Sequence, residues 1–236
     1  MTLLANLGAR PAWLTFDCYG TLIQWDEGLV AAVEAILATK GTSDVSAQRL
    51  ISVYDHYEHA LEAERPHRSF REVAGQALGM AMRDLGLDYQ DRDMETLTSR
   101  ISAMPPFQEV VPALAQLKHM GFRLCIVSNT DDDIIAGNVA QLGGHIDAVV
   151  TAQQAQAYKP SMQIFDHVYA QLGVTSADVV HVCASPHLDL VAARDIGFRC
   201  IWIDRSTARL PLADYTPDAI FPRLDRVPVL FKQLGW

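Results

Sequence analysis

From residue 110 onward, apolar runs of strand length alternate with segments of helical periodicity. Four of the runs have the length and β-branched content of buried strands: residues 122–127, 148–151, 179–183 and 199–203. Four helical segments accompany them, each followed directly by a glycine: residues 110–120, 131–142, 161–172 and 188–196. Strands and helices alternating in this way favour parallel strands joined by crossover helices. The pattern therefore predicts an α/β fold with a Rossmann-like, doubly wound parallel sheet covered by helices on both faces.

A fifth strand-like run, Trp13–Phe16, is followed directly by Asp17 and, three residues later, by Gly20. In open parallel sheets the ligand crevice lies beyond the carboxyl ends of the strands, which is where Asp17 would stand. Gly20 permits a tight turn whose main-chain N–H groups face the carboxylate. From its position alone, Asp17 could be a nucleophile, a metal ligand or a cap of the turn.

After this first strand comes a long stretch with helical periodicity and no convincing strand. Four helices are expected in it: residues 27–39, 46–64, 70–85 and 91–104. The stretch predicts a helical cap domain at residues 23–104. This cap would be inserted into a Rossmann-like core domain made of residues 1–22 and 105–236. A short helix over residues 228–234 is expected near the end of the chain.

The chain is acidic, with a formal net charge of −9. This charge argues against nucleic acid and anionic membranes as partners, although a small anionic substrate can still bind at helix N-termini and local cations. No run of eighteen apolar residues occurs, and residues 1–10 lack a signal-peptide pattern. We therefore expect a cytoplasmic protein that does not cross a membrane.

The four cysteines fall on or directly after apolar runs, and none belongs to a CxxC pair: Cys18, Cys125, Cys183 and Cys200. This spacing argues against a zinc site. It favours buried, reduced thiols, as in a cytoplasmic protein.

Polar side chains follow four of the predicted strands: Asp17, Ser128 with Asn129, Lys159, and Ser185 with Asp189. Any one of them could be a helix cap or a solvated loop residue. Because the carboxyl ends of parallel strands meet at one edge of the sheet, four such groups at successive strand ends predict a shared crevice.

Asp17, Ser128, Lys159 and Asp189 match, in order, the four motifs of the haloacid dehalogenase superfamily. The chain resembles this superfamily over essentially its whole length, including a helical cap after the first motif. The resemblance implies a hydrolase that uses Asp17 as its nucleophile, but the motifs do not specify a substrate.

Most of that superfamily are magnesium phosphatases, which carry a second aspartate two residues after the nucleophile as the general acid. Here Tyr19 occupies that position, and no carboxylate follows the strand at 179–183 until Asp189. The segment Asp17–Leu22 instead resembles the D-x-Y-G-T-L signature of L-2-haloacid dehalogenases. That resemblance implies hydrolysis of (S)-2-haloacids to (R)-2-hydroxyacids through an aspartyl ester, with no metal and no cofactor.

The resemblance also implies a role for each site residue. Asp17 would be the nucleophile, oriented by Thr21 and Lys159, while Lys159 keeps it charged. Asp189 would orient Lys159 and the hydrolytic water. Ser128, with the backbone N–H groups near Cys18 and Tyr19, would hold the carboxylate of a small-molecule substrate. The remaining binding residues would be Asn129 near the leaving halide, Tyr19 and Trp25 in the apolar wall, and Ser185. A homodimer is also implied.

Several positions depart from the dehalogenase pattern. The cap arginine that receives the halide has no clear counterpart, and the candidates are Arg49, Arg65, Arg68 and Arg71. Phe165 replaces a tyrosine of the pattern. Cys183 and Ser185 stand where the pattern has a serine–asparagine pair, and one extra residue precedes Asp189. His187, in that insert, is interpreted as a surface residue or as a proton donor for a substrate that needs one.

Three alternatives stay open from the sequence. The same site could open a strained ring in a small carboxylate such as azetidine-2-carboxylate, whose leaving amine needs a proton. The chain could be a magnesium phosphatase with an atypical acid, or a catalytically silent binding protein on this scaffold, against which Asp17 and Lys159 argue.

Overall fold

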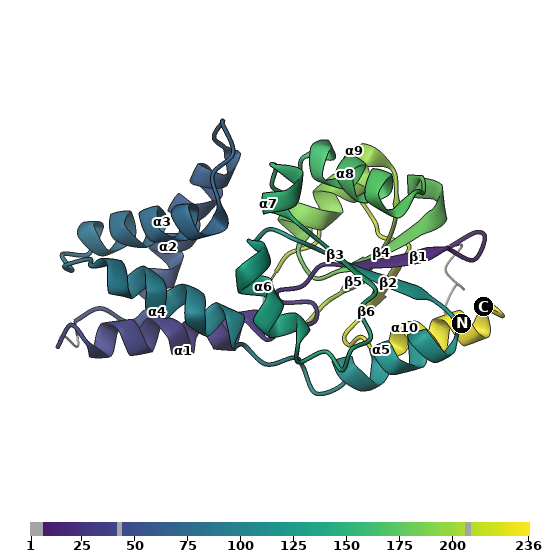
Figure 1. Cartoon of the computed structure of the whole chain (residues 1–236), viewed down its shortest axis with the longest axis horizontal. Helices are drawn as coiled ribbons and strands as arrows, with labels where there is room; N and C mark the ends of the chain where they lie inside the picture. Colours follow the sequence, from purple (N-terminus) through teal and green to yellow (C-terminus); the bar gives the residue numbers. More distant parts are fainter. Residues whose placement is uncertain (1–6, 42–43, 206–208) are drawn as a thin grey trace.

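The central sheet has six parallel strands in the order β3-β2-β1-β4-β5-β6 (Figure 1). The computed structural model describes residues 7–41, 44–205 and 209–236. The strands are β1 (Trp13–Phe16), β2 (Arg123–Ser128), β3 (Ala148–Thr151), β4 (Val179–Cys183), β5 (Arg199–Ile203) and β6 (Ala219–Phe221). This topology confirms the predicted doubly wound sheet. β6 is not among the strands expected from the sequence, because its three partly exposed residues give no periodic signal.

Helices cover both faces of the sheet, as predicted. Figure 1 shows α5 (Val110–His119) and α10 (Arg226–Gln233) on one side, and α8 (Met162–Leu172) and α9 (Val191–Ile196) on the other. Two further helices follow strand ends: α6 (Asp132–Val139) and α7 (Ala152–Ala155). Because β1 is central and covered on both faces, all four of its residues are buried, which explains its unbroken apolar run.

β1 lies at the point where the strand order reverses. It pairs with β2 on one side and with β4 on the other. The chain leaves β1 for β2 and β3, then crosses back to β4. The carboxyl ends of β1 and β4 therefore flank the crevice in which sheets of this kind bind ligands.

Four helices form a separate unit beside the sheet: α1 (Trp25–Ala38), α2 (Ala47–Ala63), α3 (Phe70–Asp84) and α4 (Asp91–Ser102) (Figure 1). All four begin and end within two residues of the predicted bounds. α2 packs against α3, and α1 packs against α4. Ser69 and Glu72 form a capping box at the start of α3, which fixes where that helix begins.

Two neighbouring chain segments join this helical unit to the sheet. Phe107 N donates to Leu22 O at 3.0 Å, and Gln24 N donates to Pro105 O at 3.0 Å. Ile23 and Pro106 form an antiparallel bridge between the same two segments. The chain therefore enters and leaves the four-helix unit at one place.

Two further polar side chains of the sheet-bearing part tie it to the four-helix unit. The Asp131 carboxylate accepts the backbone N–H groups of Phe70 at 2.8 Å and Arg71 at 2.9 Å, at the N-terminus of α3. The Asn138 amide donates to the carbonyls of Ile101 at 2.9 Å and Met104 at 3.1 Å. Both Asp131 and Asn138 are buried, so each contact is shielded from water.

The helix predicted at residues 188–196 begins differently in the structure. A π-helical turn, Pro186–Leu190, precedes α9, and Leu190 N donates to Ser185 O at 3.3 Å. A π turn accommodates one more residue than an α-helical turn. It therefore absorbs the extra residue before Asp189 while keeping that side chain buried at the strand end.

Two sequence expectations concern the chain as a whole. All four cysteines are buried and free, as predicted. Among the helices of the described residues, none combines the length and the apolar character needed to cross a membrane. Part of the N-terminal segment 1–10, namely residues 1–6, lies outside the described residues.

Candidate active site

Asp17 is held in a tight turn directly after β1. Its N–H donates to Val182 O in β4 at 3.0 Å, so the sheet hydrogen bonding continues to Asp17. Leu22 N donates to Cys18 O at 2.8 Å to close the turn. Gly20 has a φ of +80°, a conformation that a residue with a Cβ rarely adopts. The turn places the Thr21 hydroxyl so that it donates to Asp17 Oδ2 at 2.6 Å.

Lys159 bridges the two carboxylates of the site. Its Nζ donates to Asp17 Oδ1 at 2.8 Å and to Asp189 Oδ1 at 2.8 Å, and all three side chains are buried. The loop that carries Lys159 is fixed through Asn129, whose Oδ1 accepts Lys159 N at 2.7 Å. The groups that the sequence places after β1, β2, β3 and β4 therefore meet at one edge of the sheet.

The charges of this cluster are mutually dependent. Burial would lower the pKa of Lys159, but Asp17 and Asp189 outweigh it and raise that pKa, so the ammonium stays charged. The pKa of Asp189 is lowered despite its burial, because Lys159 and His181 stabilise its carboxylate. Burial raises the pKa of Asp17, and Lys159 and Thr21 oppose that rise.

His181, in the middle of β4, extends the cluster behind Asp189. Its Nε2 lies 3.0 Å from Asp189 Oδ1, and its Nδ1 lies 2.8 Å from Thr15 Oγ1 in β1. Phe165 and Phe198 pack edge-on against the ring. His181 was not predicted as a site residue from the sequence, because a histidine inside an apolar strand is normally interpreted as a core residue. Its only signal is that a lone buried histidine needs hydrogen-bond partners.

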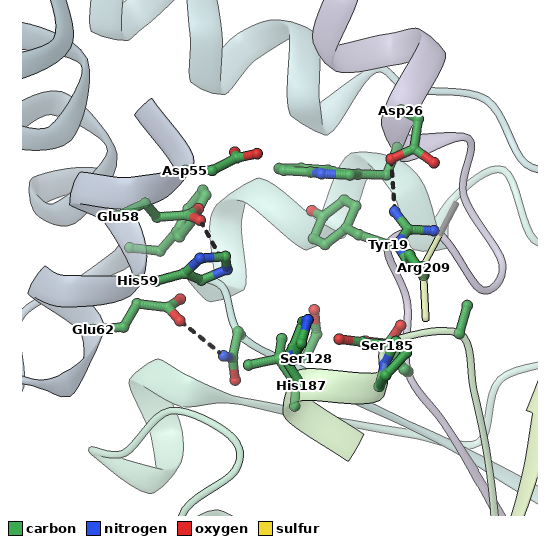
Figure 2. Close-up of a pocket in the computed structure, with 17 residues that line it drawn as sticks. Tyr19, Asp26, Asp55, Glu58, His59, Glu62, Ser128, Ser185, His187 and Arg209 are labelled. Atoms are coloured by element: carbon green, nitrogen blue, oxygen red, sulfur yellow. Dashed lines mark hydrogen bonds and ion pairs between the residues drawn. The ribbon is translucent and has the colours of Figure 1, made fainter. Parts of the chain in front are cut away.

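A cavity of about 290 Å³ opens beside the carboxylate cluster (Figure 2). Six residues predicted for the site line it: Asp17, Tyr19, Trp25, Ser128, Asn129 and Ser185. The Tyr19 and Trp25 rings are 5.1 Å apart, and the Tyr19 hydroxyl donates to Asn138 Oδ1 at 2.9 Å. Cys18 is fully buried and does not line the cavity.

Ser128 Oγ is buried and has no hydrogen-bond partner in the described part of the chain. The residue lines the cavity at the end of β2. Buried hydroxyl groups are normally satisfied by a partner. An unsatisfied hydroxyl in a cavity wall indicates a position that a ligand completes.

The opposite wall of the cavity comes from α2 and carries titratable side chains that the sequence reasoning missed. Asp55, Glu58, His59 and Glu62 line the cavity at helical spacing (Figure 2). Charged residues at this spacing usually form the solvent face of an amphipathic helix. Their helical periodicity indicates that they share one face of α2. Only the tertiary packing shows that this face is turned toward Asp17.

The four arginines predicted as halide-binding candidates do not line this cavity. Arg49 is exposed, Arg68 pairs with Glu64, and Arg71 pairs with Asp133. Arg65 lines a neighbouring cavity that shares His59, Glu62, His187 and Leu188 with the first.

Arg209 lines the cavity instead, and its Nη2 lies 2.6 Å from Asp26 Oδ1. It follows β5 in a loop far from the cap in sequence, so no cap alignment could have found it. His187 is exposed, which agrees with its interpretation as a surface residue. It also lines the cavity.

One group of side chains in the described residues has potential metal-ligand atoms within 4.8 Å of one another: His181, Cys183 and Asp189. These atoms are already engaged. Asp189 binds the Lys159 ammonium, and Cys183 Sγ lies 3.5 Å from Cys200 Sγ. Burial raises the pKa of the Cys183 thiol, which opposes the thiolate that a metal prefers. The group does not fit a metal centre.

The sheet order and the carboxylate–lysine–carboxylate cluster at its carboxyl edge define a Rossmann-like hydrolase of the α/β class. Residues 14–203 match the family described as haloacid dehalogenase-like hydrolase, which is more than half of the chain. The chain belongs to this family.

Curated relatives resemble the chain over nearly its full length. It is 28% identical over 228 residues to the (S)-2-haloacid dehalogenase of Pseudomonas sp. (strain YL), covering 93% of this chain and 94% of that one. It is 26% identical over 216 residues to haloacetate dehalogenase H-2 of Moraxella sp. (strain B), covering 91% and 95%.

Solved structures support the fold. The L-2-haloacid dehalogenase of Xanthobacter autotrophicus with chloropropionic acid covalently bound has a TM-score of 0.79 at 21% identity, covering 94% of this chain and 98% of that one. A putative hydrolase of the same superfamily from Bacillus subtilis, bound to magnesium, has a TM-score of 0.75 at 13% identity, covering 93% and 97%. At these identities the likeness concerns architecture alone, which both kinds of enzyme share.

Proposed function

We propose that the protein is a metal-independent hydrolase of small 2-substituted carboxylates, acting on (S)-2-haloacids to give (R)-2-hydroxyacids. The observation that carries this proposal is the environment of Asp17. Its carboxylate accepts from Lys159 and Thr21 and faces the cavity, while Tyr19 stands two residues later where a phosphatase keeps its acid. A halide leaves without protonation, so this chemistry needs no acid at that position.

In the first step, an oxygen of Asp17 attacks the carbon that bears the halogen. A carbon–oxygen bond forms as the carbon–halogen bond breaks, and the halide departs with the bonding electron pair. Attack from the opposite side inverts the configuration and gives an ester with Asp17. Lys159 and Thr21 hold the carboxylate in position for this attack, and the ordered geometry lowers its entropic cost.

In the second step, water attacks the carboxyl carbon of the ester and regenerates Asp17. One water proton ends on the hydroxyl of the product and the other passes to solvent, so each turnover releases a halide and a proton. Asp189 is fixed by Lys159 and His181, and we assign it the orientation of Lys159 and of this water. Ser128 Oγ and the backbone near Cys18 and Tyr19 are assigned the substrate carboxylate.

We propose that residues 23–104 act as a cap domain over a core of residues 1–22 and 105–236. The single junction and the cavity between α2 and the sheet edge support this division. Closure of such a cap excludes water from the displacement step. A homodimer and a cytoplasmic location are further predictions, and light scattering of the purified protein checks the first.

Chloride release from (S)-2-chloropropionate tests the function. We expect turnover that a chelator leaves unchanged and that Asp17→Asn abolishes, with an ester on Asp17 detected by mass spectrometry in a single turnover. Asp166→Asn, on the exposed face of α8, is the matched control and should retain activity. Absence of halide release from every short 2-haloacid would reject dehalogenation.

A further inference from the structure

The wall of the cavity that faces Asp17 is unusually rich in carboxyl groups. Asp55, Glu58 and Glu62 lie on one face of α2, and the two glutamates are buried (Figure 2). The Tyr54 hydroxyl donates to Glu58 at 3.1 Å, and the Asn129 amide donates to Glu62 at 3.2 Å. We call Asp55, Glu58 and Glu62 the α2 carboxyl stripe.

The cations in and near the cavity wall are engaged by other carboxylates. Lys159 binds Asp17 and Asp189. Arg209 pairs with Asp26 at 2.6 Å, and its charge also favours ionised Asp55. The basic side chain that pairs with Glu58 is His59, whose Nε2 lies 4.0 Å from Glu58 Oε2.

Burial lowers the pKa of His59, with a further contribution from His187, which favours the uncharged ring. Lys159 also favours the ionised form of Glu62, but its ammonium is bound by Asp17 and Asp189. Among the described residues, His59 is therefore the only basic side chain for which an ion pair with a glutamate of the stripe is recorded.

A second observation indicates that a ligand completes this site. The unsatisfied hydroxyl of Ser128 is fully buried in the same cavity, on the wall across from α2. A small carboxylate bound at Ser128 places the remainder of the molecule between Asp17 and the stripe. A simple halocarboxylate supplies only negative charge and apolar surface there, which leaves the buried glutamates without a matching group.

We propose that the α2 carboxyl stripe binds a protonated amine of the substrate, so that the enzyme prefers small 2-substituted carboxylates that also carry an ammonium group. This inference rests on the proposed function, because it takes Asp17 as the attacking group, and it adds the substrate class. The ammonium neutralises the stripe, while the substrate carboxylate is held at the sheet edge. The leaving group in the reaction is still the halide at carbon 2.

The protonation of the stripe agrees with this assignment. Burial, with a contribution from Asp55, raises the pKa of Glu58 to about 8, and burial with a contribution from Glu58 raises the pKa of Glu62 well above its ordinary value. Both pKa directions favour the protonated, uncharged forms of the two carboxyl groups, although Lys159 opposes this for Glu62. An ammonium in the cavity favours their ionised forms, so its binding is expected to release protons.

Two non-reacting ligands of matched shape test the inference. β-Alanine and butyrate differ only in an ammonium group in place of a methyl group. We expect calorimetry of the full chain to show that β-alanine binds about tenfold tighter than butyrate. A free-energy difference of this size is typical of a close, partly buried charge pair. β-Alanine should also be the stronger competitor of (S)-2-chloropropionate turnover. The reacting pair, 3-amino-2-chloropropionate and 2-chlorobutyrate, should show the same order in kcat/KM.

The Glu58→Gln, Glu62→Gln double variant keeps the shape of both side chains and removes their charge. In this variant the ratio of the butyrate Kd to the β-alanine Kd should fall to about one, with butyrate binding unchanged. Glu64→Gln, at the exposed end of α2, is the control and should keep the preference. Equal or tighter binding of butyrate, or a preference that survives the double variant, overturns the inference. Calorimetry measures binding without turnover. A failure of the proposed dehalogenation can therefore be distinguished from a failure of this inference.

Discussion

At the scale of single residues, Asp17 and Asp189 share one lysine but stand in different surroundings. Asp189 is fully buried and also interacts with His181, and its pKa is lowered. Asp17 borders the cavity, and burial raises its pKa. A more basic carboxylate is the better nucleophile, whereas a less basic one stays ionised over a wider pH range. The two pKa directions thus agree with Asp17 attacking and Asp189 orienting.

Activity should therefore be lost on the acid side through the protonation of Asp17. Because only the carboxylate attacks and its pKa is raised, the acid limb of kcat/KM should have its midpoint above about 3.9, the ordinary value for aspartate. Initial rates of chloride release at stepwise lower pH measure this. Thr21→Val removes a hydrogen bond that favours the carboxylate and should move the midpoint higher. A midpoint at or below the ordinary value contradicts the assignment.

His181 should matter for the second step more than for the first. His181→Leu removes the hydrogen bond to Asp189, and we expect kcat to fall by about ten- to hundredfold, matching about 1–3 kcal/mol. The ester on Asp17 should accumulate, and the pH profile should shift because Asp189 loses a group that lowers its pKa. His181→Gln retains a donor and should recover part of the rate. Unchanged ester levels in His181→Leu would argue for a purely structural histidine.

How far the sequence predicts the site depends on where each residue's partners lie. Asp17, Ser128, Lys159 and Asp189 were predictable because each lies at the carboxyl end of a strand or in the segment that follows it, and parallel strand ends converge. The α2 carboxyl stripe and Arg209 were not predictable, since the direction in which a helix face or a loop points is set by contacts distant in sequence. The cap helices could be placed to within two residues because their caps and periodicity are local signals.

At the scale of secondary-structure elements, Asn138 of α6 connects three segments. Its amide donates to the carbonyls of Ile101 and Met104 at the end of α4, and its oxygen accepts the Tyr19 hydroxyl from the turn after β1. All of these groups lie near the junction between the four-helix unit and the sheet. The position of the four-helix unit is thereby linked to the turn that holds Asp17.

Asn138→Leu should destabilise the protein markedly. The change removes three buried hydrogen bonds, to Ile101 O, Met104 O and the Tyr19 hydroxyl, although Met104 O keeps Gln141 and Ile101 O keeps Met104 N. We expect a loss of about 2–4 kcal/mol. Urea unfolding monitored by fluorescence measures it. Gln141→Leu, which also loses a contact to Met104 O but is exposed, should cost much less. Equal losses in the two variants would contradict the role of Asn138 as the buried tie.

At the scale of the whole molecule, Asp131 holds the four-helix unit against the sheet. Its carboxylate accepts the first two N–H groups of α3, where the helix dipole favours a negative charge. Arg71 and Asp133 add an exposed ion pair at the same place, which contributes little on its own. Asp131 is therefore the principal polar contact that holds α3 near the core on this side.

Asp131→Ala should loosen this contact without unfolding the sheet. Ser69 still caps α3, so the helix itself should persist. Hydrogen exchange at the amides of Phe70 and Arg71 should accelerate by about ten- to hundredfold, as expected for about 1–3 kcal/mol of lost hydrogen bonding. Exchange in β1 and β4 should be unchanged, and Asp131→Asn should have a smaller effect. Uniform acceleration across the sheet would show a global rather than a local effect.

The single junction at Ile23 and Pro106 has an evolutionary consequence. Because the chain leaves the sheet and returns to it at one place, the segment between these residues can be replaced by recombination or design without altering the register of the strands. The segment carries the α2 carboxyl stripe, whereas Asp17, Lys159 and Asp189 lie outside it. The residues that we propose to select the substrate and the residues that we propose to break the bond are thus encoded in separable parts of one gene. Exchange of the segment is expected to change which substrates are accepted while the reaction stays the same.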